Sequence, residues 1–187
     1  MKTKIFKFRY LFFALIIAAL ASCKGEIGPP GEDGVDGVDG NANVVTISLL
    51  ETDITWTVGS YLGRTSNVFT LDTAAVTQDI IDHGTVLAYY NLYDSWYALP
   101  FSWESTGGTE REYVFHTYSL NTIKLYAYQT TGVLDPSAIT EYRFLLITDN
   151  TVNKSESGEQ NILKQLENAG VDINNYYQVM DYYGLKY

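Results

Sequence analysis

The single cysteine, Cys23, is the most reactive side chain in this sequence of 187 residues. A cysteine thiolate is a nucleophile and a metal ligand, and two cysteines together form a disulfide. Because there is no second cysteine, an intramolecular disulfide is excluded and a dedicated use of this thiol is predicted. Cys23 directly follows two small residues, Ala21 and Ser22, at the end of an apolar run from Leu11 to Leu20.

The other residue types that perform chemistry are scattered. His83 and His116 are the only histidines and each is alone in its segment, so no cluster of zinc or copper ligands is predicted. The sequence has no Gly-x-Ser-x-Gly elbow, no phosphate-binding loop and no His-Glu-x-x-His motif. A glycosidase needs two facing carboxylates, but acidic residues are so abundant that any such pair is expected from composition. We therefore predict no catalytic residue, metal or cofactor.

The N-terminal segment predicts export from the cytoplasm. Four basic residues, Lys2, Lys4, Lys7 and Arg9, precede the apolar run, and small residues follow it. This order is typical of a secretory signal peptide. A transmembrane helix is the less favoured reading, since it needs about 20 apolar residues and this run has roughly half that number.

Leu20-Ala21-Ser22-Cys23 resembles the lipobox of bacterial lipoproteins. The resemblance implies that a leader, residues 1–22, is removed and that a diacylglyceryl group is attached to the Cys23 sulfur. Two or more acyl chains anchor a protein durably to a membrane, whereas one does not. Lys24 stands where an aspartate would favour the inner membrane, so the resemblance implies an outer-membrane location facing outward. An ordinary signal peptide that leaves a terminal cysteine is the alternative.

The charge of the chain excludes some partners. Loss of the leader would remove four of the 12 basic residues and none of the 22 acidic ones, which leaves eight basic against 22 acidic residues. Nucleic acid and anionic lipid headgroups would be repelled by such a surface. We therefore expect no nucleic-acid partner, and a membrane contact only through the N-terminal lipid.

Six glycines with a strict period of three follow Cys23, at Gly25, Gly28, Gly31, Gly34, Gly37 and Gly40. This period is typical of collagen, in which only glycine fits at the crowded axis of the triple helix. Only Pro29 and Pro30 stiffen the run, and its acidic residues would repel one another in a trimer. Residues 23–43 are therefore expected to be an extended spacer of about 50 Å. A homotrimer through the Gly-x-y run is the alternative.

Residues 44–187 are expected to form an antiparallel β-sandwich, Ig-like or jelly-roll-like, with a short C-terminal helical segment. Apolar and polar residues alternate from Val45 to Leu49 and again from Ile54 to Val58, and about eight short segments of this kind are typical of half-buried strands. Tyr142 to Thr148 is apolar on both faces, which predicts a central strand. Glu159 to Ala169 and about Asn175 to Tyr183 are predicted helices that cover an open end or edge of the sheets.

One earlier stretch lacks alternation and predicts a short helical turn. Thr77 is a suitable cap for a turn from Val76 to Asp82. We expect Ile80 and Ile81 to face the core. For the second C-terminal helix, Asp172 or Asn174 is the expected cap.

Aromatic residues crowd one strand, turn and strand between Tyr89 and Trp103. Flat rings beside polar groups suit sugars or peptides, and tyrosine supplies contact area at low entropic cost. The predicted ligand platform is therefore the set Tyr93, Trp96, Tyr97 and Trp103, with a glycan or a protein as ligand. The competing interpretation is that half of these rings belong to the core.

The order of these parts is similar to that of small Bacteroidetes-type surface lipoproteins with a short collagen-like repeat and a β-rich head. The segments that carry the resemblance are VTQDIIDHGTVLAYYNL, DSWYALPF, NTIKLYAYQ, YRFLLIT and YYQVMDYYGL. The resemblance implies a location and a fold, but no catalytic residue. We expect a lipid-anchored envelope protein that acts in binding or in a structural role, with an envelope enzyme acting on glycans as the alternative.

The lipid anchor leads to a direct test. Replacement Cys23→Ala removes the sulfur that would carry the acyl chains, so the protein should move from the membrane fraction to the soluble fraction. Fractionation followed by immunoblotting measures this. Cys23→Ala protein that stays with the membranes would contradict the anchor.

Overall fold

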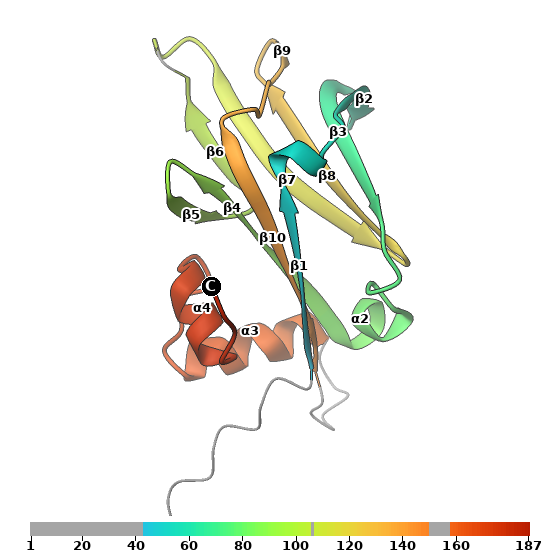
Figure 1. Ribbon diagram of the computed structural model, residues 1–187, viewed down its shortest axis with the longest axis vertical. Helices are drawn as coiled ribbons and strands as arrows, with labels where there is room; N and C mark the ends of the chain where they lie inside the picture. Colours follow the sequence, from blue (N-terminus) through green and yellow to red (C-terminus); the bar gives the residue numbers. More distant parts are fainter. Residues whose placement is uncertain (1–42, 106, 150–157) are drawn as a thin grey trace, which may run out of the picture. The chain divides into compact units, whose positions relative to one another are not determined.

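Two antiparallel sheets pack face to face in the computed structural model, which describes residues 43–105, 107–149 and 158–187 (Figure 1). The predicted leader, Cys23 and the glycine run lie outside the described residues. The four-stranded sheet has the order β1-β10-β4-β5, and the other sheet has the order β2-β3-β8-β7-β6 with β9 paired to β8. The predicted antiparallel β-sandwich is confirmed.

The strands of the four-stranded sheet are β1 (Val44–Leu50), β10 (Ile139–Thr148), β4 (Gly84–Leu92) and β5 (Ser95–Ala98). Those of the second sheet are β2 (Thr57–Tyr61), β3 (Arg64–Asp72), β8 (Thr122–Gln129), β7 (Arg111–Ser119), β6 (Phe101–Glu104) and β9 (Gly132–Val133). The helical elements are η1 (Glu51–Asp53), α2 (Gln78–His83), α3 (Gly158–Asn168) and α4 (Tyr176–Tyr182).

The core between the sheets is formed by alternate residues of the strands, as the period of two predicts. The inward residues of the two central strands that carry this pattern are Val86, Ala88 and Tyr90 on β4, and Ile123, Leu125 and Ala127 on β8. The strands therefore have the faces that their sequences predict.

β10 is the central strand that the sequence predicts. It pairs with β1 on one side and with β4 on the other. Phe144 and Leu146 face the core between the sheets, whereas Leu145 and Ile147 face a second apolar cluster on the opposite side. Both faces of this strand are therefore buried from Phe144 to Ile147, which explains the apolar run FLLI.

The C-terminal helices α3 and α4 cover the outer face of the four-stranded sheet, and not an open end or edge as predicted (Figure 1). Ile162 and Leu166 of α3, with Val179 and Met180 of α4, pack against outward residues of β4 and β10. The apolar outer face of β10 is the physical reason, since an uncovered face would expose it. None of the helices in the described residues is long and apolar enough to span a membrane.

The helix caps agree only in part with the predictions. The Thr77 hydroxyl accepts a hydrogen bond from the Ile80 N–H at 3.3 Å and caps α2, as expected. Ile80 is buried, but Ile81 is 39% exposed, because neighbouring residues of a helix point about 100° apart. The cap of α4 is Asn175, which accepts from Gln178 N–H at 3.2 Å.

The stretch around Ile54 is another difference. Alternation predicts a strand from Ile54 to Val58, but η1 occupies Glu51–Asp53 and β2 begins only at Thr57. Ile54 is nevertheless buried and Trp56 packs on the core between the sheets. The alternation there indicates which side chains are buried, but it does not indicate whether the backbone pairs with another strand.

His116 connects the two sheets at the side where β4 is unpaired. β10 pairs along the whole of β4 on one side, but β5 pairs only with Tyr89 to Leu92 on the other, so the carbonyl groups that point to the β5 side before Tyr89 lack a strand partner. Leu99 N–H donates to Ala88 O at 2.8 Å, and His116 Nε2 lies 3.1 Å from Val86 O, to which it donates. Its Nδ1 is buried without a hydrogen-bond partner among the described residues. The imidazole therefore satisfies a carbonyl that the sheet leaves free.

Burial lowers the pKa of His116, although its hydrogen bond to Val86 O raises it somewhat. The unfolded chain, with an ordinary histidine pKa near about 6.5, therefore takes up a proton at higher pH than the folded chain. Stability should be fully present above that pH and be lost as the pH falls through this value towards the lowered pKa.

We predict that the free energy of unfolding falls by up to about 1.4 kcal/mol per pH unit below pH ~6.5. Urea denaturation between pH 7.5 and 5.5 measures this. His116→Gln keeps a donor but cannot titrate, so its slope should be flatter. Thr65→Gln, at an exposed position on β3 that carries no titratable group, is the control and should keep the slope of the unchanged chain. Equal slopes for the unchanged chain and His116→Gln would contradict the prediction.

Candidate ligand-binding surfaces

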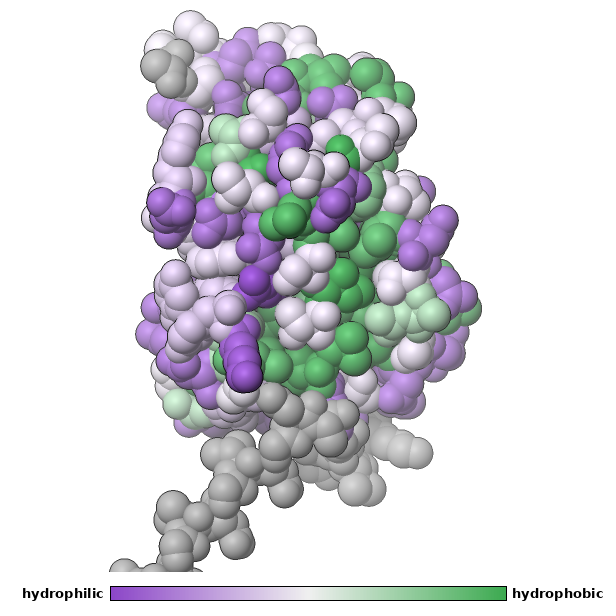
Figure 2. Space-filling view, in the orientation of Figure 1, coloured by the Kyte–Doolittle hydropathy of each residue, from purple (hydrophilic) through white to green (hydrophobic). Residues whose placement is uncertain are grey.

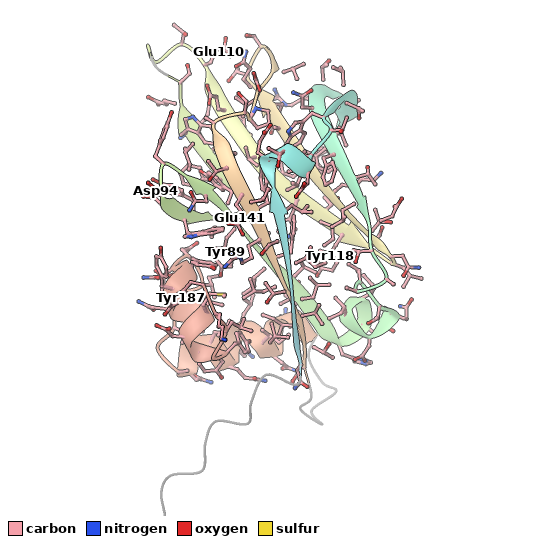
Figure 3. All side chains as sticks on the ribbon, viewed as in Figure 1. Tyr89, Asp94, Glu110, Tyr118, Glu141 and Tyr187 are labelled. Atoms are coloured by element: carbon pink, nitrogen blue, oxygen red, sulfur yellow. The ribbon has the colours of Figure 1, made fainter. Side chains whose placement is uncertain are left out.

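The four residues of the predicted platform do not share one surface. Tyr93 lies in the turn between β4 and β5, next to Asp94 (Figure 3). Its side chain is 81% exposed. Tyr97 and Trp103 point to the core between the sheets, where they stack on Tyr90 with ring centroids 5.3 and 6.4 Å apart. Trp96 points to the opposite face, under the helices. A continuous solvent-facing row of these four rings is therefore not present.

Trp96 is part of the attachment of α4 to the sheet. Its ring stacks on Tyr176 of α4, with centroids 4.3 Å apart and ring planes 19° apart. The Arg143 guanidinium of β10 lies 4.9 Å from the Trp96 ring and 5.5 Å from the Tyr176 ring. Such cation–π contacts strengthen as solvent is excluded. The position of Trp96 indicates a structural role.

Arg143 holds several elements together. It forms an ion pair with Glu141 at 2.6 Å, donates to Ser48 Oγ of β1 at 3.1 Å and donates to the Tyr176 hydroxyl. Burial raises the pKa of Tyr176, although the nearby Arg143 charge lowers it. On the same face, the Tyr89 hydroxyl donates to Ile173 O at 2.8 Å (Figure 3). These contacts fix the helical segment to the sheet.

A recess of about 400 Å³ lies beside this attachment, where α4 begins. Its lining is Asp94, Ser95, Trp96, Asp172, Asn174, Asn175, Tyr176 and Tyr177. Asp172 Oδ1 already accepts from the backbone and the side chain of Asn174, and Asn175 caps α4. The polar groups of the recess are therefore largely used by local turns.

A larger group of rings gathers on the outer face of the second sheet. We call Tyr61, Tyr113, Phe115, Tyr126 and Tyr128 the aromatic face. They alternate with inward residues, for example Tyr126 and Tyr128 with Leu125 and Ala127. The register places Tyr113 opposite Tyr128 and Phe115 opposite Tyr126. These five rings come from β2, β7 and β8.

The rings of the aromatic face contact one another closely. Tyr113 stacks on Tyr128, and Phe115 on Tyr126, with centroids 4.7 and 4.9 Å apart and ring planes 14° and 12° apart. The Tyr61 ring lies 4.6 Å from both Phe115 and Tyr126. Aromatic pairs at such spacings stabilise one another by about 0.5–1.5 kcal/mol. The surface is therefore held in one arrangement before any ligand binds.

Small residues allow Tyr61 to reach across β3. Ser66 of β3 lies on the outer face between β2 and β8 and is fully buried. Its register partner is Gly59 of β2, where an added Cβ would come within 2.9 Å of Val68 Cγ2. A side chain at Gly59 would therefore press against Val68 on the same face.

A hollow of about 440 Å³ opens beside the aromatic face. Four of the five rings line it, together with residues at the edge of the sheet, Pro100, Phe101, Ser102, Val114 and His116. Clefts from about 300 Å³ upward accept small ligands, with apolar walls and a few polar groups for orientation. The hollow has both features, since Ser102 and tyrosine residues stand among the apolar walls.

The two outer faces of the sandwich differ in their cover. The packing contacts of α3 and α4 with strands involve β4, β5 and β10 of the four-stranded sheet, and α2 packs on β4 and β10. Among the described residues, none of the helices packs extensively on β2, β7 or β8, which carry the aromatic face. Four rings of the aromatic face are partly exposed, whereas Tyr126 is buried beneath its neighbours.

Within the ranges that the structure describes, no three His, Cys, Asp or Glu side chains are grouped so as to hold a metal ion. His83 and Asp79 form a pair at 2.9 Å, but both side chains are exposed on α2. Burial raises the pKa of Tyr90 and Tyr142, so these hydroxyls stay protonated at neutral pH.

Comparison with protein-family models, with curated proteins and with solved structures finds no match for this chain. Its function is therefore argued from its own residues. Sequence reasoning missed the aromatic face, because its rings come from three strands. The signal was nevertheless present in the alternation, which places Tyr126 and Tyr128 opposite the inward residues of β8.

The contrast between Trp96 and Tyr93 can be tested by stability. Trp96→Ala removes a ring that packs on Tyr176 and Arg143, so the free energy of unfolding should fall by about 2 kcal/mol. Tyr93→Ala changes an exposed turn residue and should alter it by less than about 0.5 kcal/mol. Chemical denaturation of both variants measures the difference, and equally small effects would contradict the structural role of Trp96.

Proposed function

We propose that the protein is a lipid-anchored cell-envelope protein, on the outward side of the outer membrane, whose β-sandwich head binds carbohydrate at the aromatic face. The anchor is supported by Leu20-Ala21-Ser22-Cys23 and the spacer by the glycine period. A homotrimer through that run is the alternative to a single-chain spacer. The resemblance to small collagen-like surface lipoproteins agrees with the same arrangement.

The observation that carries the binding proposal is the aromatic face with its hollow. Five mutually packed rings lie on one face of the second sheet, on which no described helix packs extensively, beside a hollow of about 440 Å³. Sugar rings present C–H groups on their faces and hydroxyl groups at their edges. Aromatic faces suit the former, and tyrosine hydroxyls suit the latter.

The charges around the aromatic face favour acidic sugars. Alternation places Arg64, Arg111 and Lys124 on this side of the sheet, against Asp72 and Glu104. The Arg64 guanidinium lies 5.7 Å from the Tyr128 ring. In a chain with a net charge of −10, this is a local excess of positive charge. Arginine binds carboxylates in a two-point geometry, so sugars with carboxylate groups are the preferred ligands.

A glycan array with neutral and uronic-acid-containing glycans tests this function on the chain from Lys24 onward. We expect binding to acidic glycans, and about fivefold to tenfold weaker binding for Tyr113→Ala and for Tyr128→Ala, since each loses one ring contact. Tyr93→Ala, an exposed tyrosine outside the aromatic face, is the matched control and should bind normally. Binding that survives loss of Tyr113 and Tyr128, or no glycan binding at all, would contradict the proposal.

A further inference from the structure

β1 is an open edge of the four-stranded sheet. It pairs with β10 on one side, and no described residue pairs with it on the other side. An edge strand presents a row of backbone N–H and C=O groups that can pair with another chain. Proteins protect such edges with charged residues, proline, bulges, short strands or covering elements.

In the part of the chain that the structure describes, β1 has none of these protections. Its seven residues, VVTISLL, include no charge, proline or glycine, and its register with β10 is regular. The other edges differ, because β5 and β6 have four residues each and β2 has five with a central glycine. β1 is therefore the edge that is best suited to pair with a further strand.

Apolar side chains lie beside this edge. Val45 and Leu50 of β1 are 50% and 53% exposed. Ile47 and Leu49 are only partly buried against the core. Figure 2 shows a strip of apolar side chains running alongside β1 in the orientation of Figure 1. Strips of this kind on a protein surface mark interaction sites.

We propose that β1 pairs with β1 of a second copy of this chain, antiparallel and about a two-fold axis at Ile47. The two four-stranded sheets would then form one continuous sheet of eight strands. A two-fold interface requires a surface that complements itself.

The sequence of β1 has this self-complementarity. With Ile47 opposite Ile47 of the second copy, Val45 lies opposite Leu49, and all three are apolar. On the other face of the sheet, Thr46 lies opposite Ser48, and Val44 opposite Leu50. Antiparallel strands are stabilised when an apolar side chain lies opposite an apolar one, and when a hydroxyl side chain lies opposite another hydroxyl. A shift by one residue would instead oppose apolar to hydroxyl side chains.

Charge also favours this position. Two copies of a strongly acidic chain repel each other over most of their surface. β1 carries no charge, so the copies can approach there. The acidic residues that follow, Glu51 and Asp53, lie beyond the paired segment, where Glu51 would be beside Asn43 of the second copy. Like charges are therefore not placed opposite each other.

The proposal commits to a dimer. A triple helix of the glycine run would bring three copies together about a three-fold axis, and one β1 of three could not find a β1 partner. The number of copies in the assembly therefore distinguishes the two modes of association. A dimer indicates pairing at β1, and a trimer indicates a triple helix of the Gly-x-y run.

Light scattering and sedimentation of the chain from Lys24 onward, at several concentrations, measure the mass. The proposal expects twice the chain mass, reduced to the single mass by Thr46→Lys, which places a charge on the paired edge. Thr65→Lys, at an exposed position on β3, is the charge-matched control and should stay dimeric. A monomer at all concentrations, a trimer, or a dimer that survives Thr46→Lys would overturn the proposal.

A cross-link gives a second measurement that does not depend on weakening the protein. The chain from Lys24 onward has no cysteine, so Ile47→Cys would introduce one thiol per copy. Directly opposite residues of antiparallel strands have Cα atoms about 4.5–5.5 Å apart, which suits a disulfide. We expect a disulfide-linked dimer on mild oxidation for Ile47→Cys and none for Val45→Cys, whose two thiols would lie far apart. Equal cross-linking of both variants, or of neither, would overturn the register.

Discussion

Burial of β10 on both of its faces is the constraint on which the rest of the structure depends. Tyr142, Phe144 and Leu146 need a second sheet above them, and Leu145 and Ile147 need a cover on the other side. The second sheet covers the inner face of β10, and the helices α3 and α4 cover its outer face. A strand with two apolar faces is stable only between two packed layers. The fold is therefore three layers deep at β10, with helices, sheet and sheet in this order.

Arg143 is the one basic residue within this strand, and its surroundings show how a charge is accommodated there. The guanidinium is paired with Glu141, bonded to Ser48 and Tyr176, and flanked by the rings of Trp96 and Tyr176. A partly buried charge is tolerated when its donors are satisfied in this way. Because these partners belong to β1, β5, β10 and α4, one side chain joins the helical layer to the sheet. The aromatic face on the opposite side has no such helical layer among the described residues, so rings of similar chemistry are packed under helices on one side and are mostly partly exposed on the other.

The elements of the fold could be predicted from local sequence to a large extent. The strands at Gly84–Leu92 and Thr122–Gln129 and the helix at Gly158–Asn168 agree with their periodicities within one or two residues. The wrong strand predictions lie where side chains are buried but the backbone does not pair with a neighbouring strand. Ile54 and Trp56 alternate like a strand because both pack on the core, but no neighbouring strand accepts their backbone. The predicted position of α3 and α4 was also wrong. An apolar stripe along a helix shows that the helix packs on some surface, but it does not show which surface that is.

The binding surface was harder to predict, because ring type alone does not separate core from surface. Tyr97, Trp103 and Trp96 are all used in packing, whereas Tyr61, Tyr113 and Tyr128 meet only when three strands are assembled. By itself, the sequence determined the β-rich class, the faces of most strands and the two-sided burial of β10, since these follow from periodicity along the chain. Only the tertiary structure decided which outer face the helices cover, which rings come together and which edge stays open, because these depend on contacts between residues far apart in sequence.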